Sequence, residues 1–215
     1  MITERISAML SCSTTPASAS AQPPRIACII LASGFARRFN ENKLLALYQG
    51  APLICSLFSS LPRSAFAKIL TVTRYPEILD LAAQAEIEVL LHDQPLLSDT
   101  IRLGILEADK SGPYDGYMLC VADQPLLSAD TFITLVSAFA QCPDHIIRPV
   151  YQGTPGNPVI FPAQFREELL ALEGDNGGRV VIRSHLDAVY LQEIADPREF
   201  FDIDTQENLS ELQKL

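Results

Sequence analysis

The sequence has no tryptophan, only three histidines and no CxxC pair among its five cysteines. An odd number of scattered cysteines argues against a disulfide framework or a structural zinc site. His92, His145 and His185 are far apart and lack the spacing of metal ligands, so each is expected to be structural or superficial. The sequence therefore gives no sign of a zinc centre.

Basic residues are also scarce, because 16 lysines and arginines stand against 26 acidic residues, giving a formal net charge of −10. This charge would repel a polyphosphate backbone, and no run of Lys or Arg offsets it, so no nucleic-acid partner is expected. No apolar stretch reaches the roughly 18 residues of a membrane span, and the first residues lack the pattern of a secretory signal. We expect a cytoplasmic protein with no membrane partner.

The chain length of 215 residues, with 48% hydrophobic residues, suffices for one sizeable core but hardly for two. Residues 1–24 contain a tract rich in Ser, Thr, Ala and Pro with little to bury, and we expect them to form a flexible tail. Residues 25–215 are predicted to form a single domain.

Short apolar runs alternate with helical spacing after Arg25, and most runs are too apolar on both faces for a half-exposed sheet. The pattern predicts a three-layer α/β/α domain with a mainly parallel sheet. Ligands of such sheets bind beyond the carboxyl ends of the strands. The predicted strands are Ile26–Leu31, Ile69–Thr73, Glu86–Leu91, Tyr117–Val121, Ile146–Val150 and Ala188–Leu191. The predicted helices are Pro52–Leu61, Pro76–Ala83, Thr100–Ala108, Ala129–Ala140 and Pro162–Leu172.

A loop of small and basic residues, Leu31–Lys43, follows the first predicted strand. Its residues of interest are Ala32, Ser33, Gly34, Arg38 and Lys43. Small residues let backbone N–H groups approach a polyanion, and the two cations can neutralise it. Neither a Walker GxxxxGK[ST] loop nor a GxGxxG turn is present. The loop predicts a different kind of triphosphate cradle, and the alternative is a surface turn with solvated basic residues.

The hexapeptide Asp-Gln-Pro-Leu-Leu-Ser occurs twice, at Asp93–Ser98 and at Asp123–Ser128, each time after an apolar run. A carboxylate at the end of a buried strand is well placed to hold Mg²⁺, which takes few protein carboxylates and completes its shell with phosphate oxygens and water. The alternative for either aspartate is an N-cap or a turn. Position alone leaves both aspartates open as metal ligands.

Five segments occur in the same order as in the molybdenum-cofactor nucleotidyltransferases, and the chain most resembles their cytidylyltransferase branch, which serves molybdenum hydroxylases. The resemblance covers nearly everything after Arg25. It implies the Rossmann-like fold of the nucleotide-diphospho-sugar transferases. The matching segments are Leu31–Lys43, Val121–Leu127, Gly156–Phe161, Gly174–Gly178 and Phe201–Leu209.

The resemblance implies a role for residues of each segment. It places the nucleotide on Leu31, Ala32, Ser33 and Gly34, its phosphates on Arg38 and Lys43, and Mg²⁺ on Asp123 rather than Asp93, with Asp204 supporting the metal. It places Ser98 and Thr100 near the nucleobase, and Gly156, Asn157, Pro158 and Asp175 on the acceptor side. Arg38, Lys43 and Asp123 form the catalytic set.

Three positions depart from the family pattern. Ser33 replaces the usual alanine, Asn40 stands where glycine is common, and Leu96 or Leu97 occupies the place of a glycine before Ser98. Serine and asparagine remain compatible with a loop. The leucines leave recognition of the base open.

The resemblance implies transfer of a nucleoside monophosphate, expected to be CMP from CTP, to the phosphate of molybdenum cofactor, with release of pyrophosphate. The expected partners are an NTP, molybdenum cofactor and a molybdenum hydroxylase apo-enzyme. A phosphate acceptor is already ionised, so positioning and charge neutralisation can suffice without a general base. One alternative is a nucleotidyltransferase for a sugar phosphate or an isoprenoid-precursor phosphate. Another is a non-catalytic carrier or chaperone of molybdenum cofactor, although Arg38, Lys43 and Asp123 favour catalysis.

Overall fold

The structure, a computed structural model, describes residues 22–34 and 42–213. Nearly all of the predicted tail lies outside the described residues, and so do Arg38 and Asn40. Within the described ranges, no helix is both long and apolar enough to cross a membrane. Cys28, Cys55 and Cys120 are free thiols.

An eight-stranded sheet forms the centre of the molecule in the order β10-β7-β9-β6-β1-β4-β5, with β8 paired to β7. The strands β1, β4, β5, β6, β7 and β10 run parallel, and β9 is antiparallel to both of its neighbours. The strands are β1 Ile26–Ala32, β4 Lys68–Thr73, β5 Glu88–Leu91, β6 Gly116–Val121, β7 Ile146–Tyr151, β8 Thr154–Pro155, β9 Val159–Pro162 and β10 Val189–Glu193. The predicted mainly parallel sheet is confirmed.

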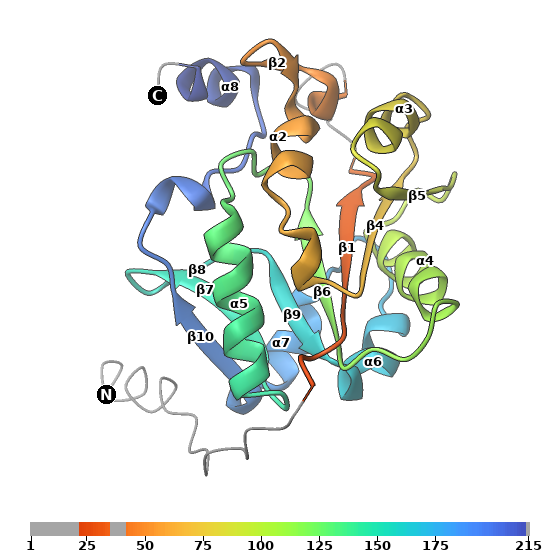
Figure 1. The fold of residues 1–215 in the computed structure, drawn as a ribbon, viewed down its shortest axis with the longest axis vertical. Coiled ribbons are helices and arrows are strands. Elements are labelled where there is room, and N and C mark those ends of the chain that lie inside the picture. The colour runs from red at the N-terminus through yellow and green to blue at the C-terminus, as the bar shows by residue number, and fades with distance from the viewer. Residues whose placement is uncertain (1–21, 35–41, 214–215) are drawn as a thin grey trace.

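Helices cover both faces of this sheet (Figure 1). On one face lie α2 Leu53–Ser60, α3 Glu77–Gln84 and α5 Ala129–Gln141; on the other lie α4 Leu97–Asp109, α6 Arg166–Leu170 and α7 Arg179–Ser184. Short 3₁₀ turns lie at η1 Lys43–Leu45, η2 Arg63–Ala65, η3 Ala163–Phe165, η4 Leu186–Ala188 and η5 Pro197–Phe200. This arrangement confirms the predicted three layers.

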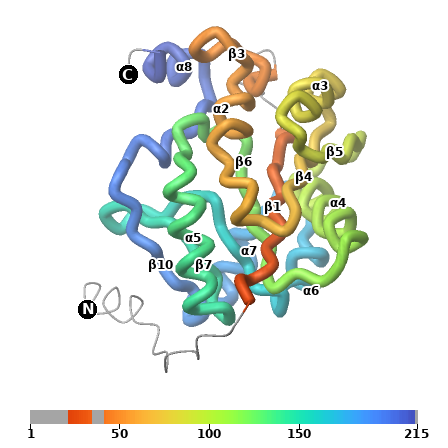
Figure 2. Tube along the Cα trace, in the orientation of Figure 1, coloured from red at the N-terminus to blue at the C-terminus, as the bar shows by residue number. Residues whose placement is uncertain are grey.

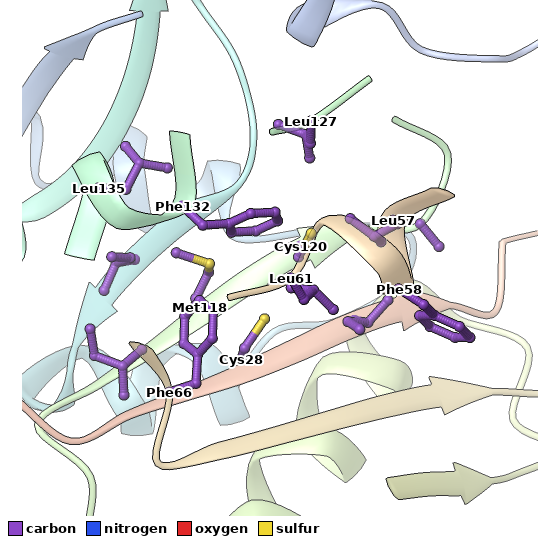
Figure 3. Close-up of a cluster of buried hydrophobic side chains, with 14 of the residues drawn as sticks. Cys28, Leu57, Phe58, Leu61, Phe66, Met118, Cys120, Leu127, Phe132 and Leu135 are labelled. Atoms are coloured by element: carbon purple, nitrogen blue, oxygen red, sulfur yellow. The ribbon is translucent and has the colours of Figure 1, made fainter. Parts of the chain in front are cut away.

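The central strand β1 is buried on both faces because its residues alternate between two cores. Cys28 and Ile30 belong to the core under α2 and α5, and Ala27 and Ile29 belong to the core under α4. Figure 3 shows the first of these cores, in which Phe132 and Met118 lie near Cys28. A strand between two helical layers must be apolar on both sides, as its sequence is.

The C-terminal segment packs against a small hairpin at one end of the molecule. The hairpin consists of β2 Leu47–Tyr48 and β3 Ala51–Pro52, and the last helix is α8 Gln206–Leu212. Ile203, Leu209 and Leu212 form a third apolar cluster with residues of the hairpin and of α2. Figure 2 shows α8 beside this hairpin. The packing carries the segment before α8 back to the carboxyl edge of the sheet.

The duplicated hexapeptide has two different structures. In the first copy, Ser98 lies inside the first turn of α4 and is buried. In the second, Ser128 is the N-cap of α5 and accepts a hydrogen bond from Thr131 N–H. The buried carboxylate of Glu199 accepts hydrogen bonds from the Ser128 backbone N–H and hydroxyl. The two copies therefore do not share a structural role.

Candidate active site

The adjacent strands β1 and β6 end together, as their register pairs Leu31 with Val121. The chain leaves β1 through Ser33 and Gly34, and it leaves β6 through Ala122 and Asp123. Parallel strands therefore deliver the start of the Leu31–Lys43 loop, called the donor loop below, and the predicted metal ligand Asp123 to the same edge of the sheet.

Lys43 lies between the two predicted metal ligands. Its Nζ is 2.7 Å from Asp123 Oδ2 and 2.9 Å from Asp204 Oδ1. Lys43 begins η1, whose N-cap Asn42 accepts a hydrogen bond from Leu44 N–H. Asp204 is held near Asp123 because Ile203 N–H donates to the Asp123 carbonyl. Residues from three distant parts of the chain thus form one charged cluster.

The charges of this cluster shift two pKa values. Partial burial lowers the pKa of Lys43, but Asp123 and Asp204 more than offset this effect, so the net shift is upward and the ammonium stays charged. The pKa of Asp202 is raised to about 6, first by desolvation and then by the negative charge of Asp123, although a hydrogen bond with Gln124 opposes the rise. Negative charge is therefore concentrated at this edge of the sheet.

The cluster fits a hard divalent cation that also contacts a substrate. Asp123 Oδ1 is buried and has no hydrogen-bond partner among the described residues, so one carboxylate oxygen is left to bind a ligand. Across residues 22–34 and 42–213, no three Asp, Glu, His or Cys side chains form a ready metal cluster. A cation here would take few protein ligands and complete its shell with phosphate and water, as Mg²⁺ does.

A cavity of about 190 Å³ lies directly beside this cluster and is called the donor cavity below. Six of the residues predicted to bind the nucleotide or the metal line this cavity, namely Leu31, Ser33, Gly34, Lys43, Thr100 and Asp123. Ala32 is buried, and Ser98 is 1% exposed; neither lines this cavity. The predicted phosphate ligand Arg38 lies outside the described residues.

Side-chain hydrogen bonds fix the start of the donor loop. The Ser33 hydroxyl donates to the Val72 carbonyl at 3.1 Å. His92 Nε2 lies 2.7 Å from the Ser33 hydroxyl oxygen. Because the hydroxyl proton is committed to a carbonyl, His92 Nε2 must carry the proton of the second bond. The Tyr75 hydroxyl donates to the Gly34 carbonyl at 2.9 Å. His92, which was expected to be structural or superficial, thus supports the loop.

A second cavity, of about 290 Å³, adjoins the first and is called the acceptor cavity below. The two cavities share Leu31, Leu97, Val121 and Asp175. Two of the residues predicted for the acceptor side, Asn157 and Asp175, line the acceptor cavity, whereas Gly156 and Pro158 do not. Gly156 instead packs on Phe200, whose ring would lie 2.4 Å from an added Cβ.

Three arginines that the sequence analysis did not select also line the acceptor cavity: Arg148 from β7, and Arg179 and Arg183 from α7. Two signals in the sequence point to them. Arg148 interrupts the apolar run of a predicted buried strand, and Arg179 and Arg183 are four residues apart, which places them on one side of a helix. Asp93, in contrast, is exposed beside β5 and lines neither cavity.

The fold matches solved structures over nearly its full length. It resembles Rv0371c from Mycobacterium tuberculosis H37Rv, with a TM-score of 0.76, 20% identity, and coverage of 89% of this chain and 99% of that one. A manganese complex of Rv0371c has a TM-score of 0.72 and 20% identity, with coverage of 88% of this chain and 98% of that one. A structure of CMP:2-keto-3-deoxy-manno-octonic acid synthetase complexed with CTP has a TM-score of 0.68 and 12% identity, with coverage of 88% of this chain and 97% of that one. The fold is that of the nucleotide-diphospho-sugar transferases, a class of nucleotidyltransferases.

The particular family follows from the sequence. The model of the MobA-like NTP transferase domain matches residues 28–189, so the chain belongs to that family. The purine catabolism protein PucB of Bacillus subtilis (strain 168) is 26% identical over 200 residues, which cover 86% of this chain and 94% of PucB. Family and fold together support a nucleotidyltransferase enzyme.

Proposed function

We propose that this enzyme transfers CMP from CTP to the phosphate of molybdenum cofactor and releases pyrophosphate. The observation that carries the proposal is the pair of adjoining cavities, one beside Lys43 and Asp123 and the other beside Asn157 and Asp175. A donor and an acceptor bound side by side react as if in one molecule, which lowers the entropic barrier to transfer.

In this proposal the donor cavity holds the triphosphate. Ser33 and Gly34 present backbone N–H groups to it, and Lys43 and Arg38 neutralise its charge. Thr100 also lines this cavity and is proposed to contact the nucleoside. Lys43 is paired with Asp123 and Asp204, so its ammonium group can offset the negative charge of these carboxylates and of the phosphates together.

Asp123 and Asp204 are the proposed Mg²⁺ ligands. When bound, Mg²⁺ supplies positive charge that stabilises the transition state at the α-phosphorus and its leaving pyrophosphate. The buried free oxygen of Asp123 supports this role. The manganese complex of the structurally similar Rv0371c is consistent with a divalent ion in this fold.

The acceptor cavity has both apolar and polar walls. Leu97, Ile101, Leu119, Val159 and Phe161 provide apolar surface on which the flat ring system of molybdenum cofactor can pack. Asn157, Asp175 and Asn176 provide polar groups that could also bind the hydroxyl groups of a sugar. The similarity to a synthetase of a sugar-acid nucleotide keeps a sugar-type acceptor as the second candidate, because the donor half is common to both.

The test is a matrix of donors and acceptors. The protein is incubated with Mg²⁺, one of the four NTPs, and molybdenum cofactor, a sugar phosphate or an isoprenoid-precursor phosphate, and pyrophosphate release is measured. We expect release only with CTP and molybdenum cofactor, with CMP attached to the product. Release with a sugar phosphate alone would support the second candidate, and cofactor binding without release would indicate a carrier.

A further inference from the structure

The arginines of the acceptor cavity differ from most of the other described basic residues in how their charge is balanced. Among the described residues, seven other basic side chains pair with carboxylates: Lys43 with Asp123, Lys68 with Glu88, Arg63 with Glu86, Lys110 with Glu107, Arg102 with Asp99, Arg166 with Asp109 and Arg198 with Asp196. Within the described part of the chain, Arg148, Arg179 and Arg183 form no ion pair.

Arg148 is held in place by the protein. It is half-buried, its Nε donates to the Gly156 carbonyl at 3.1 Å, and its Nη2 donates to the Pro155 carbonyl at 3.5 Å. Burial and the positive charge of Arg179 both lower the pKa of Arg148. Two like charges therefore interact, and that of Arg148 is also partly desolvated, which is unfavourable unless a third group offsets them.

A protein with a net charge of −10 has many carboxylates that could pair with these side chains. Yet Asp175, the one acidic residue that lines the acceptor cavity, forms no salt bridge with them among the described residues. The guanidinium group offers a planar fork of N–H donors that matches the oxygens of a phosphate. The cavity thus combines unpaired positive charge with apolar walls.

We propose that Arg148, Arg179 and Arg183 form a binding subsite for a phosphate group of the acceptor, separate from the triphosphate cradle at Lys43. The arginines line only the acceptor cavity, and Lys43 lines only the donor cavity, so the two sets hold different anions. The acceptor is accordingly a phosphorylated molecule with an apolar, ring-like body. This inference rests on the proposed function for the identity of the cavity as the acceptor side.

The subsite also offsets the repulsion between the two substrates. Transfer requires a phosphate of the acceptor to approach the triphosphate, and both are negatively charged. Positive charge fixed in advance beside the acceptor lowers this electrostatic barrier without any reorganisation during the reaction. Asp175 lines both cavities at their boundary, where its negative charge would repel a phosphate group bound in the wrong place.

The test measures binding of inorganic phosphate by calorimetry, first without nucleotide and then with the donor cavity filled by a non-hydrolysable CTP analogue and Mg²⁺. We expect phosphate to bind in both conditions. Arg179→Gln and Arg183→Gln should each weaken phosphate binding by about tenfold, a loss of about 1.4 kcal/mol, and leave affinity for the CTP analogue within twofold. Arg148→Gln should show the largest loss, and the two exposed arginines keep the test valid if that variant unfolds.

Arg198→Gln is the matched control, because Arg198 pairs with Asp196 and lines neither cavity. Wild-type phosphate affinity in both α7 variants, or an equal loss in Arg198→Gln, would overturn the proposal. Tighter binding of malonate than of phosphate would overturn the phosphate assignment in favour of a carboxylate. Since binding is measured without turnover, an absence of pyrophosphate release would contradict the proposed function and leave this subsite standing.

Discussion

Lys43 Nζ lies 2.7 Å from Asp123 Oδ2, so the donor loop and the end of β6 are joined by an ion pair between two proposed catalytic residues. Only 14% of the Lys43 side chain and 22% of the Asp123 side chain are exposed. Removal of one partner from a pair this sheltered leaves an uncompensated charge, which costs more stability than the loss of a surface salt bridge does. Lys43 therefore stabilises the fold as well as the proposed transition state.

Lys43→Met should reveal both roles. It keeps most of the apolar stem but leaves Asp123 and Asp204 without their counter-charge, so we expect the free energy of unfolding to fall by about 1–3 kcal/mol. Turnover should fall by a larger factor, about a hundredfold or more, because phosphate charge is no longer neutralised. The measurement is thermal unfolding with and without Mg²⁺: the variant should gain more stability from Mg²⁺ than the wild type does.

The control for Lys43→Met is Lys68→Met, which removes an ion pair between a sheltered lysine and the exposed Glu88, and neither residue lines the cavities. Because this variant keeps Asp123 and Asp204, its gain in stability from Mg²⁺ should equal that of the wild type. An identical Mg²⁺ response in wild type and Lys43→Met would argue against a metal site at Asp123 and Asp204.

The Ser33 hydroxyl is predicted to set the affinity for the donor. Ser33→Ala removes the group that links Val72 and His92, so the start of the loop is less well fixed. We expect the KM for the NTP to rise by about three- to tenfold with kcat nearly unchanged, as for a loss of preorganised binding. Steady-state kinetics check this result, and an unchanged KM together with a lower kcat would assign Ser33 to the chemical step.

His92 predicts a dependence of stability on pH. Its pKa is lowered by burial first and by Arg74 second, although Asp99 and Asp93 oppose the shift. Because the folded state favours neutral His92, its stabilising contribution is present above the unfolded pKa of 6.5 and is lost as the pH falls below that value. Melting temperatures from pH 7.5 to 5 should fall less steeply in His92→Gln than in the wild type. Parallel curves would show that His92 is not coupled to folding.

Gly156 is predicted to be required for packing next to the acceptor cavity. An alanine Cβ would lie 2.4 Å from Phe200 Cδ1, so Gly156→Ala must displace the ring or the backbone that receives the Arg148 hydrogen bond. We expect a loss of about 1–3 kcal/mol in unfolding free energy, measured by urea denaturation. Gly34→Ala is the control, because nothing lies within 4 Å of its added Cβ. Equal stability of the two variants would contradict this packing.

The sequence predicts the sheet and most of the helices because their apolar periodicity is local. It misses β9 as a strand, since Val159–Pro162 has only four residues after a Gly-Asn-Pro turn and pairs antiparallel. It also misses α7 and α8, which have six and seven residues and are stabilised by tertiary packing rather than by their own length. Pro162–Leu172, predicted as one helix, is a 3₁₀ turn followed by the short α6.

The candidate site was predictable only where its residues follow strand ends. Asp123 follows β6 directly, and Ser33 and Gly34 follow β1, so topology alone brings them together. The contact of Lys43 with Asp204 joins residues 161 positions apart and depends on how α8 docks on the hairpin. No local pattern contains that information. Local signals mark the three arginines separately, but their meeting at one cavity could not be predicted, because β7 and α7 come together only in the folded protein.

The most direct measurement compares the two copies of the hexapeptide. Pyrophosphate release from CTP and molybdenum cofactor is followed across a Mg²⁺ titration for wild type, Asp123→Asn and Asp93→Asn. Loss of about 4 kcal/mol of transition-state stabilisation predicts a roughly thousandfold fall in turnover for Asp123→Asn, with Asp93→Asn close to wild type. Equal losses in both variants, or an Asp123→Asn enzyme that remains active, would contradict a metal-dependent transfer centred on Asp123.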